Sequence, residues 1–319
     1  MDIADKYGVK VTLFSDVLCA DRLKEWNFNA FCLPYKNQLQ YAIANGHDVQ
    51  LHIHPHWLTT RFDGNEFHPS CDFSLSDFRD DTKFGGIPGI IKRAIESLRE
   101  ICMPANEQYQ CVAFRAGGYN IYPDTELIIK SLYENGIRYD CSMAKGYYFK
   151  SGISEVDFRK LPDDPNWIIN PQNYRLTLTD QPGILEIPIA TIPKTPFEIP
   201  TRFKLKKYAH RAVENRGRLI HRDNRTGFIS KLKMLFSARM LSFDNHTLSI
   251  DYLMRIVGYN MDKYKNKTDN MMFCVVSHPK SMGDYSFNLM ERFIASIQKR
   301  YPETEFTTCS QLYQENQWV

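Results

Sequence analysis

The chain of 319 residues has eight cysteines but no CxxC pair and no regular spacing between them. They lie at positions 19, 32, 71, 102, 111, 141, 274 and 309. This pattern excludes a zinc ribbon and argues against a disulfide framework. Cys111 and Cys274 lie in apolar, strand-like runs, as buried thiols commonly do. We therefore expect free thiols in a reducing compartment, with the cytoplasm as the location.

Long apolar runs and repeats are also missing. No stretch of eighteen apolar residues occurs, so the sequence predicts no membrane-spanning helix. Residues 1–6 have no apolar stretch of the kind found in signal peptides. There is no internal repeat or low-complexity segment, and the apolar content of 43% is ordinary for a globular protein. We expect a single domain over residues 1–319.

The small net charge of +3 hides a basic block. Residues 202–239 hold twelve Lys and Arg against two acids, whereas the rest of the chain holds 28 bases and 35 acids. One interpretation is a solvated helical face. Another is contact with the phosphates of a nucleotide sugar or lipid-linked sugar, or with an anionic membrane leaflet. Nucleic acid is not expected, because no nucleic-acid-binding motif is present and the rest of the chain is acidic.

Short apolar runs alternate with helical patterns along most of the chain, which is typical of parallel β/α architectures. Strands are predicted at 9–14, 48–52, 110–114, 137–141, 184–189 and 272–277, and helices at 35–45, 85–101, 124–135 and 288–299. Two segments interrupt this rhythm. Residues 143–182 are predicted to form a long loop or hairpin excursion, and 195–250 a basic insertion that is helical at 231–241.

Three of the nine histidines, His52, His54 and His56, lie within five residues at the end of a predicted strand. Pro55 ends that strand, so the imidazoles gather where the strand becomes a loop. Sheet-based enzymes build their sites at such strand ends. Neutral imidazole is also the commonest protein ligand of zinc-like metals. A metal site is therefore predicted here, and the alternative is a histidine-rich surface loop.

This segment resembles the polysaccharide deacetylase family (NodB-homology domain, carbohydrate esterase family 4). Residues 46–56 are similar to the family motif Gly-His-Glu-Ile-Gly-x-His-[Ser/Thr]-x-x-His, with the two metal-binding histidines at His52 and His56. Residues 114–119 resemble the Arg-x-Pro-aromatic motif, residues 10–14 a Lys-Ala-Thr-Phe-Phe strand, and residues 275–279 the final strand that ends in a histidine. The resemblance spans about residues 1–280 and implies an irregular (β/α) barrel. The Arg-Ala-Gly-Gly variant at residues 115–118 and the long central insertion are reminiscent of deacetylase-like proteins from lipopolysaccharide and capsule gene clusters.

One family motif is absent. The Thr-Phe-Asp-Asp motif ends the first strand of the family, and there is no room for it before the strand that starts at Val9. Its aspartates would supply the catalytic base and the third metal ligand. We therefore expect a barrel that lacks its first strand, or chemistry that uses other residues. Asp16 is the best local substitute, and its alternative role is to cap a helix or turn.

The resemblance implies roles for the remaining site residues. A divalent metal, most simply zinc, would activate water, and a carboxylate would take the proton. The turn Gly117, Gly118 and Tyr119 would bring backbone N–H groups to the oxyanion, and His278 would be the general acid. Arg115 would orient a catalytic carboxylate through a bidentate pair. The structural alternatives are a strand-end His278 that is bonded to a backbone carbonyl, a purely structural Arg115, and a turn at Gly117 and Gly118 that only redirects the chain.

Two further residues lie outside the predicted pair of metal ligands. His54 is placed on the strand face opposite His52, outside the ligand pair, unless the kink at Pro55 turns it toward the metal. Glu186 lies within an apolar strand and is expected to face the barrel interior.

The sequence therefore predicts a metal-dependent deacetylase-like hydrolase that acts on an N-acetylated sugar in surface-polysaccharide biosynthesis. Two alternatives stay open. One is a catalytically inactive carbohydrate-binding protein on the same scaffold, which the absent Asp-Asp motif supports. The other is a different metal-dependent amidohydrolase, for which the chain offers no matching late Lys or Asp pattern.

Overall fold

The computed structural model describes residues 1–170, 183–195, 227–244, 248–268 and 270–315. Its helices are α1 (Asp2–Lys6), α2 (Val17–Glu25), α3 (Asn29–Ala44), α4 (Gly86–Cys102), α5 (Thr125–Glu134), α7 (Phe228–Leu235), α8 (Ile250–Tyr264), α9 (Asp284–Arg300) and α10 (Cys309–Gln314). Its strands are β1 (Thr12–Asp16), β2 (Asp48–Ile53), β3 (Arg61–Phe62), β4 (Phe67–His68), β5 (Ala113–Ala116), β6 (Tyr139–Asp140), β7 (Tyr148–Lys150), β8 (Glu155–Asp157), β9 (Trp167–Ile169), β10 (Ile184–Glu186), β11 (Thr191–Ile192) and β12 (Arg239–Met240). Short 3-10 turns include η1 (Pro55–Leu58), η2 (Leu75–Phe78), η3 (Gly117–Tyr119) and η6 (Pro279–Ser281).

A six-stranded sheet in the order β1-β2-β5-β6-β10-β9 organises the fold. The first five strands run parallel, and only β9 is antiparallel to its neighbour β10. Within the described residues no hydrogen bonding joins β1 to β9, so the sheet is open there. The predicted α/β class with a parallel sheet is confirmed. Closure into a barrel is not observed.

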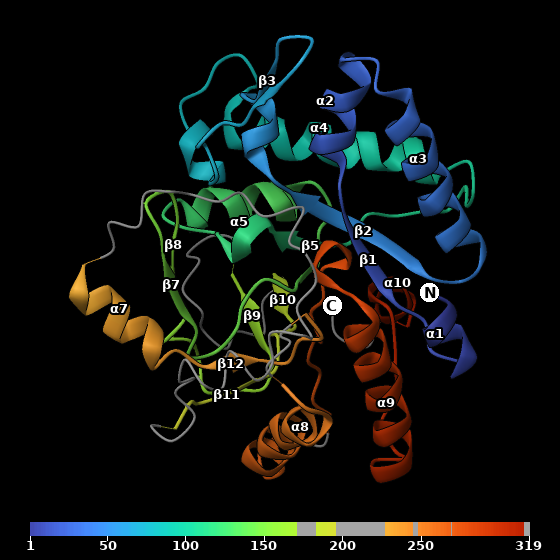
Figure 1. Cartoon of the computed structure of the whole chain (residues 1–319), viewed down its shortest axis with the longest axis vertical. Helices are drawn as coiled ribbons and strands as arrows, with labels where there is room; N and C mark the ends of the chain where they lie inside the picture. The colour runs from blue at the N-terminus through green and yellow to red at the C-terminus, as the bar shows by residue number, and fades with distance from the viewer. Residues whose placement is uncertain (171–182, 196–226, 245–247, 269, 316–319) are drawn as a thin grey trace.

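Side chains of the parallel strands alternate between two apolar cores, because successive strand residues point to opposite faces. Phe114 and Ile184 pack on the side of α2–α5, where α4 contributes a row of buried Ile and Leu residues. Ala113 and Leu185, their chain neighbours, pack on the other face with α10. Figure 1 shows α2, α3 and α4 together on one side of β1 and β2. The later helices α8 and α9 lie away from this group.

The predicted strands and helices are largely found, with shifts at their ends. Each of the first five predicted strands overlaps a strand of the sheet, and helices α3, α4, α5 and α9 overlap their predictions. Residues 272–277 are an exception, because they make only isolated bridges, Cys274 to Ile189 and Val276 to Ser242. The helix predicted at 231–241 was also misplaced: α7 ends at Leu235, and Arg239 and Met240 form β12.

The two predicted excursions contain more regular structure than expected. Segment 143–182 holds the hairpin of β7 and β8, and it also supplies β9, the edge strand of the main sheet. Of segment 195–250, residues 196–226 and 245–247 lie outside the described residues. Its described part contains α7 and β12, and β12 pairs with β11. Among the described helices, none has both the length and the apolar content needed to cross a membrane. Four of the eight cysteines are buried.

Candidate catalytic site at the ends of the parallel strands

Three site residues lie in one row across neighbouring strands. Asp16 is the register partner of His52, and His52 is the register partner of Arg115. They occupy β1, β2 and β5 near the carboxyl ends of these strands, where open α/β sheets place their sites. The pairing therefore brings together residues that are 36 and 63 positions apart in sequence.

Asp16 and His54 form a hydrogen-bonded pair. Nδ1 of His54 lies 3.0 Å from Oδ2 of Asp16, and the side chains are both partly exposed. Burial acts to raise the pKa of the Asp16 carboxyl. The hydrogen bond from His54 and the nearby imidazoles outweigh it, so that pKa lies below its usual value. The ionised carboxylate then accepts a hydrogen bond from the Nδ1–H of His54, which leaves Nε2 as the nitrogen with the free lone pair.

The prediction that separated His54 from His52 was wrong. The two rings lie edge to face with centroids 4.5 Å apart. The physical reason is that residues i and i+2 of a strand share a face. The sequence also did not indicate that His54 would form a hydrogen bond with Asp16.

His52 and His56 are held differently from His54. Nδ1 of His52 lies 2.7 Å from the carbonyl oxygen of Arg115, which makes Nδ1 the protonated nitrogen and Nε2 the one with a lone pair. Burial, followed by the nearby His54, lowers the pKa of His52 to about 3, so this ring is neutral at physiological pH. The His56 ring is stacked on Phe73 with centroids 4.5 Å apart and also contacts the ring of His54, centroids 5.6 Å apart.

The side chains of this cluster include atoms that could bind a metal ion. A backbone carbonyl on Nδ1 of His52 is the arrangement that commonly orients metal-binding histidines. The carboxylate of Asp16, however, is engaged by His54. Across the described parts of the chain, no group of three or more His, Cys, Asp or Glu side chains is arranged to hold a metal ion. As they stand, these residues do not fit a three-ligand site, and the zinc prediction rests on the sequence alone.

The turn η3 packs directly against the histidine cluster. A Cβ atom on Gly117 would lie 2.4 Å from the Ile53 carbonyl oxygen and 2.8 Å from Cδ2 of His54, so only glycine allows this approach. Gly118 and Tyr119 both have left-handed backbone angles, φ 58° and 61°. Such a conformation is costly for tyrosine and often marks a functional turn.

A second aspartate–histidine pair lies at the other end of this turn. Nδ1 of His278 is 2.5 Å from Oδ2 of Asp244, and the ring of Tyr119 contacts the His278 ring with centroids 6.4 Å apart. Burial acts to raise the pKa of Asp244, but the hydrogen bonds from His278 and Ser242 hold it below its usual value. The sequence did not identify Asp244 as a site residue, because nothing in its local pattern indicates a partner 34 residues away.

Arg115 is buried but makes different contacts from those predicted. Its Nε donates to the carbonyl oxygen of Cys141 at 2.9 Å, and the guanidinium lies over the Phe14 ring, 4.6 Å from its centroid. Within the described residues no ion pair links Arg115 to a carboxylate, so the predicted bidentate orientation of a catalytic acid is not seen. Glu186 is fully buried, and its Oε1 accepts from the backbone N–H of Met143. The described residues show no closed barrel, so its predicted position facing a barrel interior stays a prediction.

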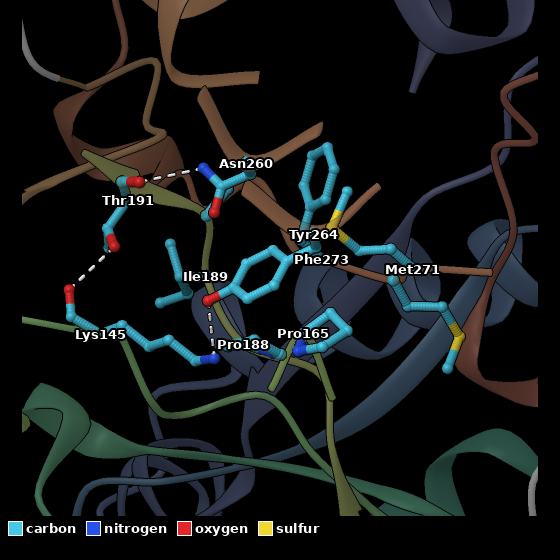
Figure 2. Close-up of a pocket in the computed structure, with 11 residues that line it drawn as sticks. Lys145, Pro165, Pro188, Ile189, Thr191, Asn260, Tyr264, Met271 and Phe273 are labelled. Carbon is cyan, nitrogen blue, oxygen red and sulfur yellow. Dashed lines mark hydrogen bonds between the residues drawn. The ribbon is translucent and has the colours of Figure 1, made fainter. Parts of the chain in front are cut away.

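Two cavities lie away from the histidine cluster, around Lys145. A crevice of about 10 Å³, room for about one water, lies between the loop after β6 and helix α8. Figure 2 shows the Lys145 ammonium reaching the Tyr264 hydroxyl, and Thr191 bonded to both Lys145 and Asn260. A wider cleft of about 370 Å³ adjoins it. These cavities hold none of the histidine pairs, whereas His54 and His278 are partly exposed to solvent.

Comparisons with known proteins give one informative likeness. No protein-family model matches the chain, and no curated protein matches it. Its fold is similar to that of a proposed polysaccharide deacetylase from Mycobacterium smegmatis, with a TM-score of 0.50 and 14% identity over 98% of this chain and 74% of that one. A GH57 branching enzyme from Thermococcus kodakaraensis aligns with a TM-score of 0.40 and 10% identity over 96% of this chain and 55% of that one, too low to support an argument. The chain therefore has a polysaccharide deacetylase-like α/β fold.

Proposed function

We propose that this chain is a hydrolase that removes the acetyl group of an N-acetylated sugar in surface-polysaccharide biosynthesis. The likeness in fold to a proposed polysaccharide deacetylase supports a carbohydrate substrate. The observation that carries the proposal is the turn Gly117–Tyr119, which packs on His54 at one end and on His278 at the other. The proposal places one acetamido group between these two histidines, which contact opposite ends of the same turn.

The first half of the reaction needs a base. In the proposal, Nε2 of His54 takes a proton from water while Asp16, bonded to Nδ1, orients the ring and balances its positive charge. The water oxygen bonds to the acetyl carbon, and the electron pair of the carbonyl moves to its oxygen. Backbone N–H groups of Gly117 and Gly118 would stabilise that oxyanion.

The second half needs an acid. His278 gives the proton on Nε2 to the sugar nitrogen as the C–N bond breaks, and Asp244 stabilises the imidazolium form beforehand. Acetate leaves, and the sugar keeps a free amine. His54 releases its proton to solvent and His278 takes one up, which closes the balance. We propose a nucleotide sugar, a lipid-linked sugar or a glycan as the carrier of the acetamido group.

Acetate release from N-acetylglucosamine oligosaccharides tests this proposal. We expect Asp244→Asn to lower kcat by roughly 10²–10⁴-fold, because general acid catalysis contributes about that much, with little change in KM. A matched control is Asp63→Asn, which breaks an aspartate–histidine pair with His68 of similar length on an exposed hairpin. Equal activities for the two variants would contradict the assigned role of His278 and Asp244.

The same assay separates the enzyme from the carbohydrate-binding alternative. A chain that binds the oligosaccharides in calorimetry but releases no acetate is a binding protein, and the hydrolase proposal then fails. No step is assigned to a metal, because the described side chains do not form a complete ligand set.

A further inference from the structure

Helix α7 carries an apolar stripe on its outer surface. Phe228, Ile229, Leu232 and Phe236 at its C-cap are 79%, 69%, 45% and 53% exposed. Residues four positions apart lie on the same side of a helix, so Phe228, Leu232 and Phe236 form one line with Ile229 beside it. No residue of α7 is buried.

The opposite side of α7 holds the helix against the protein. The hydroxyl of Tyr148 on β7 lies 3.4 Å from that of Ser230, and the Lys233 ammonium lies over the Tyr148 ring. Figure 1 shows α7 at the periphery, beside β7 and away from the helices that cover β1 and β2. The apolar stripe is therefore turned away from the packed core and is anchored in that orientation.

Helix α7 itself carries charges of one sign only. Helix α7 contains Lys231 and Lys233 and no acid, and residues 202–239 contain twelve Lys and Arg against two acids. An apolar stripe beside basic residues is the composition of helices that lie in the interface of anionic membranes. A partner protein with an apolar groove would fit the stripe but would leave this excess of positive charge unexplained.

We propose that α7 docks this protein on an anionic lipid bilayer. Phe228, Ile229 and Leu232 enter the boundary between headgroups and acyl chains, while Lys231 beside the stripe contacts lipid phosphates. The two contributions act together, because a short apolar stripe or a basic segment alone gives only weak, reversible binding. This inference stands independently of the catalytic proposal.

Sedimentation of the full chain with lipid vesicles tests the docking surface. We expect binding to vesicles that contain phosphatidylglycerol and at least roughly tenfold weaker binding to phosphatidylcholine alone. Phe228→Asp combined with Ile229→Asp should weaken binding by roughly tenfold or more. Lys231→Glu should weaken binding to the phosphatidylglycerol vesicles and leave binding to phosphatidylcholine vesicles unchanged.

Leu33→Asp is the matched control, because Leu33 is 61% exposed on α3 and lies outside the stripe. It should bind vesicles as the native chain does, and circular dichroism should report the same fold for every variant. Native protein that stays in the supernatant, or an α7 variant that binds normally, would overturn the proposal. So would light scattering that shows a native oligomer which the α7 substitutions dissociate, since a second copy would then cover the stripe.

Discussion

Replacing Gly117 by alanine should damage the site out of proportion to its effect on stability. The added Cβ would lie 2.4 Å from the Ile53 carbonyl oxygen, about 1 Å inside the 3.4 Å of ordinary contact, and 2.8 Å from the His54 ring. Either the turn or His54 must move. Overpacking of this kind costs about 1–3 kcal/mol of the free energy of unfolding, and a displacement of about 1 Å at a reacting group can cost roughly a hundredfold in rate.

Gly183→Ala provides the comparison. Its Cβ would lie 2.5 Å from the Ile169 carbonyl oxygen and 2.6 Å from the Ile168 side chain, a clash of the same kind between β9 and β10. We expect urea unfolding to show similar losses of stability for the two variants. Acetate release should fall by about a hundredfold in Gly117→Ala only. The reasoning is refuted if Gly117→Ala keeps native activity, or if both variants lose activity to the same degree.

Two further predictions concern the histidine cluster. Folding lowers the pKa of His52 from 6.5 to about 3. Between these two pH values the unfolded chain carries a proton on His52 that the folded chain lacks. Stability should therefore fall as the pH drops from 6.5 toward 3, by up to about 1.4 kcal/mol per pH unit. Urea unfolding should show a flatter dependence for His52→Gln, and an unchanged slope would contradict the burial argument. Metal analysis tests the zinc that the sequence alone predicts: about one ion per chain, reduced in His52→Ala and His56→Ala but not in His68→Ala, would favour that prediction over the metal-free reaction. A zinc-free native protein would remove that prediction.

The parallel sheet could be predicted because its strands are short apolar runs bounded by clear breaks. Gly46 and Pro55 enclose β2, and the strand indeed ends at Ile53. The edge strand β9 was not foreseen, because a three-residue strand in a polar excursion is defined by its pairing with β10 rather than by its own pattern. The bridges of Cys274 and Val276 depend on tertiary contacts in the same way.

The candidate site shows the same division between local and distant information. His52, His54 and His56 are neighbours in sequence, so their clustering could be predicted from the strand end alone. The pairs that orient His54 and His278 could not, since Asp16 and Asp244 are brought to them by strand register and loop packing. The sequence therefore predicted the imidazoles, but not their hydrogen bonds to Asp16 and Asp244.

The position of β9 has a consequence for how the chain assembles. Strands β1, β2, β5 and β6 add to the sheet in the order of synthesis, each beside the one before. Strand β9 emerges before β10, yet its place is outside β10. During translation β9 therefore has no sheet partner until β10 has been synthesised. This interval exposes two open strand edges, the stage at which a nascent chain is most prone to wrong pairing.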